Sequence, residues 1–352
     1  MLSNRYISDG KSLIELNDTQ TSAKEQYLKK VQSGEYFFVP VPCCVCSGSD
    51  FEPLSNKDRY GIESRIVICR NCGLIQQNPR ISWESYTDFY NQEYRLLYGG
   101  EPPGERLFQL EYSKGEKIFG WLSKNAGLSR PLSELSILEV GCAVGGILQY
   151  FKDQGCQVRG FDLDEESIKF GKEKHELDLT VGTIRSVNYR PDVVIYADTF
   201  EHLLYPEEDL AHVREILSTC GILYIGTPGV RRLLEENRDF LRLLQNAHTY
   251  YFSLCTLTNL VETSRFKLVA GDESIISAFR HSIHQKSVVS DYDPTMRYLA
   301  KWEHLRELFT LLPSGRPQDV VMELLIRLLK FTRLYNCTLW LKTHTRKIKV
   351  KE

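Results

Sequence analysis

The segment ILEVGCAVGG, at residues 137–146, joins an apolar run to a helical pattern through a turn of small residues. Gly141, Ala143 and Gly145 allow the backbone to approach a ligand closely, and the start of a helix offers unpaired N–H groups. Such a loop holds pyrophosphate in dinucleotide-binding proteins, but here the carboxylate of Glu139 would repel a diphosphate. The loop therefore predicts a site for a cofactor with positively charged groups. The alternative is an α/β turn whose glycines serve packing alone.

A second acid, Asp162, ends the next apolar run, VRGFD, about twenty residues after the glycine loop. A carboxylate at this interval can accept hydrogen bonds from the hydroxyls of a ribose. Because the acid–glycine loop and this acid occur together, they favour a ribose-containing cofactor over a turn that is purely structural.

Asp198, Glu201 and His202 follow a later apolar run in the sequence ADTFEH. Ligands of open α/β sheets bind at the carboxyl ends of the strands, so Asp198 is a candidate cofactor contact. His202 is suited to removing a proton from a bound nucleophile, and Glu201 could orient its ring or bind a metal. The alternative is that Glu201 caps a helix while His202 packs against the sheet. His248, in HTYYFS, could close over the same site or be a packing residue among aromatic side chains.

Four cysteines form two C-x-x-C pairs, Cys43 with Cys46 and Cys69 with Cys72, separated by 22 residues. Each pair presents two thiolates from one tight turn, and two pairs complete the tetrahedral shell of a zinc ion. All four ligand positions are then filled, so this zinc is expected to be structural. A redox role is the alternative, but two pairs at this spacing favour the metal.

Apolar runs and helical patterns alternate through the middle of the chain and predict the elements that position these residues. Strands are expected at residues 136–140, 157–161, 193–197, 222–226, 267–270 and 275–279, and helices at 146–154, 165–174, 207–217 and 254–263. Strands separated by such helices form βαβ units. The expected fold class is α/β, a doubly wound Rossmann-like sheet with a terminal antiparallel strand, beside a small zinc-ribbon-like module and C-terminal helices.

The remaining segments surround this sheet. We expect a polar lead-in at residues 1–38, the zinc-binding module at 39–80, an aromatic helical linker or lid at 81–130, the main domain at 131–280, and a helical extension with a basic tail at 281–352. Tyr90, Tyr94 and Tyr98 are candidates for the lid, although an aromatic stripe is usually core. The tail could touch an anionic membrane surface or a polyanionic acceptor, or be a solvated end.

The bulk composition limits the classes of function. A formal net charge of -2 gives no broad attraction for nucleic acid, so we expect no stable nucleic-acid partner. Ten cysteines, four of them in C-x-x-C pairs, fit a reducing compartment. The sequence shows neither a signal peptide nor an apolar run of about 18 residues that could span a membrane. We therefore expect a cytoplasmic protein.

The segments LEVGCAVGGIL, GFDLDEESI, DVVIYADTFEHLLYPEEDL and ILSTCGILYIGTPG together resemble class I S-adenosylmethionine-dependent methyltransferases. The resemblance implies that Glu139, Gly141, Ala143 and Gly145 line the methionine and ribose end of the cofactor, with Asp162 at the ribose. Ala143 departs from the glycine that is common in the family. The order of zinc module, aromatic linker and main domain resembles methyltransferases of sugar and polysaccharide biosynthesis, including zinc-containing sugar C-methyltransferases.

The expected function is transfer of a methyl group to an oxygen or carbon atom of a small-molecule, nucleotide-sugar or glycan acceptor. His202, Glu201 and His248 are the catalytic candidates, and S-adenosylmethionine and structural Zn²⁺ are the expected cofactors. Two alternatives stay open, an RNA-modifying methyltransferase and a binding module of the same fold without catalysis. Salt-dependent RNA binding would favour the first alternative, and methyl transfer to any acceptor would exclude the second.

Overall fold

The structure, a computed structural model, describes residues 1–127, 132–237 and 239–310. The chain divides into two compact units, residues 1–300 and 301–352. Of the second unit, the described residues belong to the end of helix α10 (Tyr292–Thr310). The basic tail expected at residues 342–352 lies outside the described residues. Among the helices that the structure describes, none is both long and apolar enough to cross a membrane.

A seven-stranded sheet forms the main domain, with the strand order β12-β13-β10-β9-β6-β7-β8. Its strands are β6 (Ser136–Val140), β7 (Gln157–Asp162), β8 (Leu179–Val181), β9 (Val193–Ala197), β10 (Ile222–Gly226), β12 (Phe266–Gly271) and β13 (Ile276–His281). The first five run parallel, whereas β13 is antiparallel to both β10 and β12. This confirms the doubly wound sheet and its antiparallel end. The sequence missed β8, which has only three residues.

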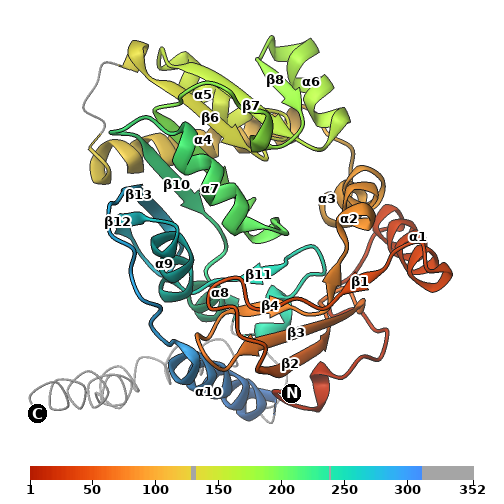
Figure 1. Cartoon of the computed structure of the whole chain (residues 1–352). Helices are drawn as coiled ribbons and strands as arrows, with labels where there is room; N and C mark the ends of the chain where they lie inside the picture. The colour runs from red at the N-terminus through yellow and green to blue at the C-terminus, as the bar shows by residue number, and fades with distance from the viewer. Residues whose placement is uncertain (128–131, 238, 311–352) are drawn as a thin grey trace, which may run out of the picture. The chain divides into compact units, whose positions relative to one another are not determined.

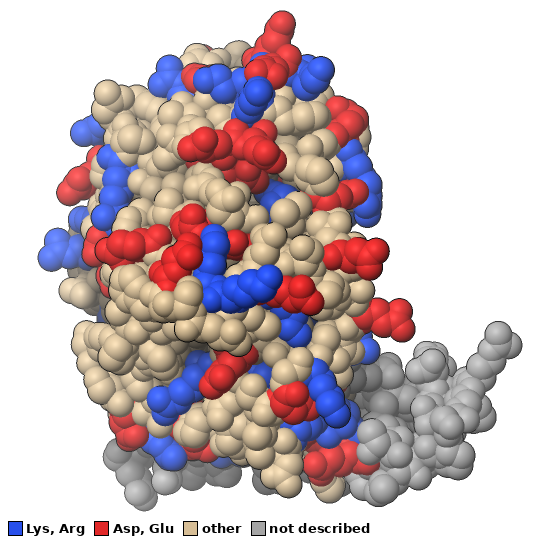
Figure 2. All heavy atoms as spheres, turned by 90° about the vertical axis from the view of Figure 1, so that its right-hand side faces the viewer, with Lys and Arg blue, Asp and Glu red and all other residues tan. Residues whose placement is uncertain are grey.

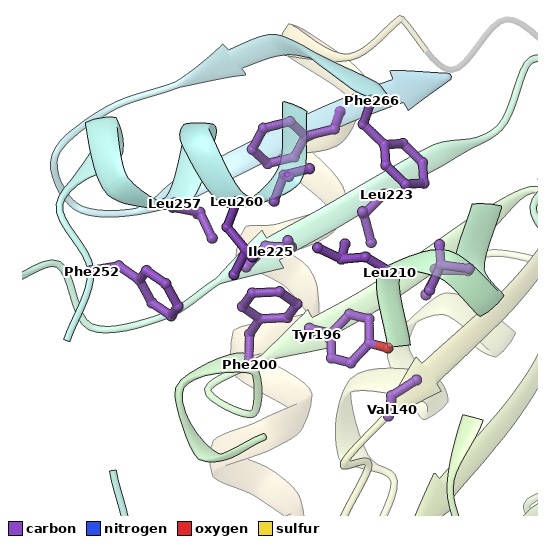
Figure 3. Close-up of a cluster of buried hydrophobic side chains, with 14 of the residues drawn as sticks. Val140, Tyr196, Phe200, Leu210, Leu223, Ile225, Phe252, Leu257, Leu260 and Phe266 are labelled. Atoms are coloured by element: carbon purple, nitrogen blue, oxygen red, sulfur yellow. The ribbon is translucent and has the colours of Figure 1, made fainter. Parts of the chain in front are cut away.

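Helices cover both faces of this sheet. They are α4 (Glu105–Asn125), α5 (Gly146–Asp153), α6 (Glu165–His175), α7 (Pro206–Ile216) and α9 (Leu254–Thr263). A further helix, α8 (Val230–Asn237), follows β10 and was missed by the sequence. Alternate strand residues face opposite layers. Tyr196, Leu223 and Ile225 pack toward α7 and α9 (Figure 3), whereas Ile137 and Ile195 pack toward α4 and α5. Burial on both faces explains why the strands are continuous apolar runs.

The N-terminal region contains more regular structure than a polar lead-in. Helix α1 (Asp18–Ser33) begins with a capping box between Asn17 and Gln20 and ends at Gly34, whose φ is 78°. A capping box and a left-handed glycine are sufficient start and stop signals for a helix with few apolar residues. Tyr27 of this helix is buried against the aromatic segment that follows the cysteines.

The cysteine-rich region forms a four-stranded sheet with the order β11-β4-β3-β2. Its strands are β2 (Phe51–Lys57), β3 (Glu63–Cys69), β4 (Ile75–Gln77) and β11 (Tyr250–Tyr251). Because β11 lies far along the chain, the module expected at residues 39–80 shares its sheet with a segment of the main domain (Figure 1). A separate two-stranded pair joins β1 (Phe38–Val39) to β5 (Arg80–Ile81).

The aromatic segment is helical and breaks at Gly100. It comprises α2 (Trp83–Phe89), a π-helical turn η2 (Tyr90–Tyr94) and α3 (Arg95–Gly99), followed by α4. The short 3-10 turns of the chain are η1 (Asn4–Tyr6), η3 (Leu132–Glu134), η4 (Ile184–Ser186), η5 (Phe200–His202) and η6 (Phe240–Leu243). π-Helical turns inside α-helices often occur at functional sites, and this one faces the cavity described below.

Candidate active site

The glycine loop adopts left-handed backbone conformations at three positions between β6 and α5. The φ angles of Gly141, Ala143 and Gly145 are 72°, 43° and 82°. A Cβ atom at position 141 would lie 2.3 Å from Oγ1 of Thr199, so only glycine fits there without a shift. Ala143 tolerates its conformation at a cost that glycine would avoid. The turn expected from the sequence is therefore present.

Asp162 lies at the end of β7 and braces the loop. Its Oδ2 accepts a 2.7 Å hydrogen bond from the backbone N–H of Ala143, and its Oδ1 accepts a 2.8 Å bond from the N–H of Asp164. Each carboxylate oxygen can accept a second bond, so Asp162 can hold the loop and still receive ribose hydroxyls. This side chain has a structural role that the sequence did not predict.

Three carboxyl groups gather beside the loop, of which Glu139 and Asp162 are buried and Glu111 is partly buried. Burial raises the pKa of Glu111 to about 7, and it raises the pKa of Glu139 well above its ordinary value, with repulsion from neighbouring carboxylates adding to the effect. Burial raises the pKa of Asp162 as well. Oε2 of Glu139 has no hydrogen-bond partner among the described residues. A cation nearby would stabilise the ionised forms, so the cluster fits a positively charged ligand.

A cavity of about 800 Å³ opens beside these residues. Gly141, Ala143, Asp162 and Asp198 line one part of it, and His202 lines another. Its volume lies in the upper part of the range of about 300–1,000 Å³ for small-molecule sites. The cavity therefore has room for a cofactor together with a small acceptor. Of the predicted site residues, Glu139, Gly145, Glu201 and His248 are not among those that line it.

His202 ends the η5 turn and is held in one orientation. Its Nδ1 lies 2.9 Å from the carbonyl oxygen of Ala247, and a carbonyl only accepts, so Nδ1 carries the proton. Burial lowers the pKa of His202 to about 4, so the ring is neutral near pH 7. Its Nε2 therefore presents a lone pair, 3.5 Å from the hydroxyl of Tyr94, which also lines the cavity.

The sequence predicted Glu201 as the group that orients His202, but the orienting bond comes from Ala247. Glu201 is 2% exposed, and neither of its carboxylate oxygens makes a hydrogen bond of ordinary geometry to a described residue, although Thr227 lies near. Burial raises the pKa of Glu201, and the charge of Asp198 adds to the rise. The backbone oxygen of Glu201 accepts a 2.9 Å bond from Thr249.

Glu201, His202 and His248 offer ligand atoms that all lie within 4.8 Å of one another, a spacing that a metal centre would require. The Gln245 amide is fixed because its Oε1 accepts a 2.6 Å bond from Arg59. Its Nε2 therefore donates to Nε2 of His248, which places the proton of the neutral His248 ring on Nδ1. Neither nitrogen of His248 retains a free lone pair, and the three side chains do not fit a metal centre in this arrangement.

The four predicted zinc ligands do come together. The Sγ atoms of Cys43 and Cys72 are 3.4 Å apart, those of Cys46 and Cys69 are 3.5 Å apart, and all four lie within 4.8 Å of one another. Four sulfurs at about 2.3 Å from one Zn²⁺ would be spaced by slightly more than 3.5 Å. The donor set and its geometry therefore fit a zinc ion, and the four ligands would leave no position open for chemistry.

Several cavity residues escaped the sequence analysis. Arg95 belongs to α3, and Glu111 and Lys114 lie three residues apart on α4, where side chains share one helix face. Oε2 of Glu111 accepts a 3.1 Å bond from the N–H of Gly146 at the start of α5. The spacing of Glu111 and Lys114 indicates that they share a helix face. The sequence around them does not show that this face of α4 packs against the glycine loop.

Residues 108–270 match a family described as a methyltransferase domain. A malonyl-[acyl-carrier protein] O-methyltransferase of Pectobacterium atrosepticum is 26% identical over 94 residues, which cover 26% of this chain and 34% of that protein. The chain thus spans about a third of the length of this curated relative.

Solved structures of low sequence identity also resemble the chain. Magnesium protoporphyrin IX methyltransferase from Synechocystis PCC 6803 is 14% identical, with 55% of this chain and 94% of that chain covered and a TM-score of 0.40. A protein from Pyrococcus horikoshii OT3 is 19% identical, with 57% and 96% covered and a TM-score of 0.40. The family match, the strand order and the acid–glycine loop together identify residues 108–270 as a class I S-adenosylmethionine-dependent methyltransferase domain.

Proposed function

We propose that the chain transfers the methyl group of S-adenosylmethionine to an oxygen or carbon atom of a small-molecule, nucleotide-sugar or glycan acceptor. The observation that carries the proposal is the lone pair of His202 Nε2, which meets the same cavity as the glycine loop and Asp162. A proton acceptor and a cofactor loop in one enclosed site are the parts that methyl transfer needs.

The cofactor would lie along the carboxyl edge of the sheet. Gly141 and Ala143 provide close backbone contact, Asp162 accepts from the ribose hydroxyls, and Asp198 lies farther along the same edge. The carboxyl groups of Glu111 and Glu139 favour the positive charges of the methionine end. When bound, the cofactor supplies an electrophilic methyl group on a sulfonium.

The acceptor would lie between this edge and the aromatic segment. The bound cofactor would supply the methyl group, and Nε2 of His202 would take the proton from the nucleophilic atom of the acceptor. Ala247 stabilises the ring in the tautomer that can accept the proton. Tyr90 and Tyr94 cover the site and help to exclude water.

A structural Zn²⁺ bound by Cys43, Cys46, Cys69 and Cys72 is part of the proposal, and its support is the clustered donor set. RNA is a weaker acceptor candidate. On the face shown in Figure 2, the lysine and arginine side chains of the described residues are interspersed with aspartate and glutamate. This mixed surface supports a small acceptor over a polyanion.

The test is calorimetric titration of S-adenosylmethionine into the zinc-replete protein and its Asp162→Asn variant. Wild type should bind, and the variant should bind at least about tenfold more weakly, a loss of about 1.4 kcal/mol. Asp178→Asn is the matched control, because Asp178 is an exposed acid of the same domain that pairs with Arg159. Well-folded wild-type protein that binds no cofactor would contradict the proposal.

A further inference from the structure

The basic side chains that line the cavity are already neutralised. Arg95 contacts Oδ2 of Asp164 through both Nε and Nη2 at 3.2 Å, and Lys114 pairs with Asp198. Nη2 of Arg185 lies 2.6 Å from Glu208. A phosphate group that entered the cavity would have to compete with a carboxylate at any of these cations that it approached.

Of the three cations, Arg185 has the most exposed side chain. The side chains of Arg185 and Glu208 are 51% and 53% exposed, and such pairs contribute little stability, so Arg185 could in principle turn toward a phosphate. However, Asp209 also lies 3.9 Å from Arg185, so two acids surround this cation. Moving Arg185 would leave both carboxylates beside the anion, which disfavours the exchange.

The charges of the side chains that line the cavity also disfavour a phosphate group. Among the described residues that line the cavity, carboxyl side chains outnumber basic ones six to three: Glu84, Glu111, Asp162, Asp198, Glu208 and Asp209 against Arg95, Lys114 and Arg185. One cationic cofactor offsets only part of this excess. A cavity with excess negative charge and low-dielectric walls attracts cations and repels anions.

The surface left for the acceptor is aromatic. Trp83, Tyr86, Tyr90 and Tyr94 line the wall formed by α2 and the π-helical turn. The rings of Tyr90 and Tyr94 stack at 4.2 Å with an angle of 9° between their planes, and the ring of Tyr94 meets His202 edge to face at 5.5 Å. Such a wall offers broad apolar contact with hydroxyl groups at its margins.

We propose, on the basis of the proposed function, that the acceptor is a neutral hydroxylated ring without a phosphate, held against this aromatic wall with its reacting hydroxyl at His202. That hydroxyl oxygen would take the methyl group as the bond between this group and the sulfur of the cofactor breaks, and the hydroxyl proton would pass to Nε2 of His202. Nucleotide-linked sugars are thereby excluded, whereas glycosides and phenols of suitable size remain.

Binding of inorganic pyrophosphate tests the charge argument directly. The zinc-replete full chain is first saturated with S-adenosylhomocysteine, so that the cofactor site is closed and its occupancy is confirmed by calorimetry. Wild type should then bind pyrophosphate at least about tenfold more weakly than Glu208→Gln, in which Arg185 has lost its nearest acid. Glu215→Gln is the matched control, because it removes the same charge from an exposed position of the same helix.

Pyrophosphate binding by wild type as tight as by Glu208→Gln would overturn the inference. Failure of S-adenosylhomocysteine to bind would instead contradict the proposed function, so the two failures are distinguishable. In a second arm, labelled S-adenosylmethionine is offered with sugars supplied both as aryl glycosides and as nucleoside diphosphate esters. At least about tenfold higher kcat/KM for the glycoside of a pair is expected, and preference for the diphosphate ester would overturn the inference.

Discussion

The two halves of the cavity are built in different ways. The cofactor half comes from consecutive strand-to-helix turns of one sheet, with Gly141, Asp162 and Asp198 at the ends of β6, β7 and β9. The acceptor half combines His202 with Tyr94, more than a hundred residues earlier in the chain, and with Ala247, more than forty residues later. One half is specified by local turn chemistry, and the other by packing between distant segments.

The acceptor half depends on the cysteine-rich sheet for its position. The N–H of Gln77 in β4 donates to the carbonyl oxygen of Thr249 at 2.9 Å, which holds the segment that carries Ala247. The guanidinium of Arg80 donates to Tyr250 at 2.8 Å and to the carbonyl oxygen of Leu204. A zinc ion would therefore stabilise the acceptor half indirectly, without contact to either substrate.

Removal of the zinc ion should produce the largest difference between the two halves of the cavity. In Cys69→Ser one ligand is lost, and we expect the zinc content to fall and acceptor turnover to disappear, because structural zinc contributes about 10–16 kcal/mol in small modules. The affinity for S-adenosylmethionine should stay within about threefold of wild type. Metal analysis and calorimetry check this, with Cys220→Ser, an exposed cysteine, as the control. Cofactor affinity that fell in parallel with turnover would show that the two halves are not separable.

Substitution of the proton acceptor should abolish turnover without disturbing the cofactor half. We expect His202→Gln to lower kcat by about 10²–10⁴-fold, because a positioned general base contributes by that factor. The Kd for S-adenosylmethionine should be unchanged, since His202 lies in the other half of the cavity. Single-turnover kinetics measure the first and calorimetry the second, with the exposed His284→Gln as the control. A kcat of His202→Gln equal to that of wild type would contradict the role of His202 as the proton acceptor.

A methyl group at position 141 should weaken cofactor binding, the property that His202→Gln leaves unchanged. In Gly141→Ala the new Cβ meets Thr199 Oγ1 at 2.3 Å in a backbone with φ of 72°. We expect cofactor affinity to fall by at least about tenfold. Gly155→Ala separates clash from backbone strain, because Gly155 has a φ of 96° but nothing lies within 4 Å of its Cβ. That variant should lose only about 1 kcal/mol of stability and keep its affinity.

The contrast between the halves also explains what the sequence could predict. Strands, helix order, the glycine loop and the four cysteines were found because each is a local pattern whose physical meaning survives without tertiary context. Helix α1 was underestimated because its capping box, rather than apolar periodicity, defines it. The pairing of β11 with β4 was missed because a two-residue strand gives no signal and its partner lies far away in the sequence.

The site residues divide in the same way: the sequence shows their positions, but not the contacts that tertiary packing gives them. Asp162 was found at its expected place, but its bond to Ala143 was not foreseen. His202 was a candidate by its edge position, whereas its orienting partner is a backbone carbonyl, which no residue type reveals. His248 was open between catalysis and packing, and its bond to Gln245 favours the packing role.

The affinity of the cofactor half for S-adenosylmethionine should depend moderately on pH. Glu111, with a pKa raised to about 7 by burial, faces Arg95, Lys114, Asp162 and the N–H of Gly146. Its ionised form attracts a cationic ligand, so affinity for S-adenosylmethionine should fall as pH drops below about 7 and level off above it, by less than tenfold per pH unit. Calorimetry between pH 6 and 8 checks this. The dependence should vanish in Glu111→Gln, and its persistence there would assign it to another group.

The smallest expected effect concerns Ala143, the one departure from a glycine in the loop. With φ of 43°, its side chain sits in the left-handed region, which costs an alanine about 0.5–1 kcal/mol relative to glycine. Ala143→Gly should relieve that strain while the bond from the backbone N–H to Asp162 is kept, because the bond involves no side chain at position 143. Glycine also gives the unfolded chain more freedom, so the net gain in stability should be at most about 0.5 kcal/mol, measured by chemical denaturation. A stability loss above about 1 kcal/mol would mean that the Ala143 methyl group packs usefully in the cavity wall, and the cofactor half would then depend on tertiary packing as the acceptor half does.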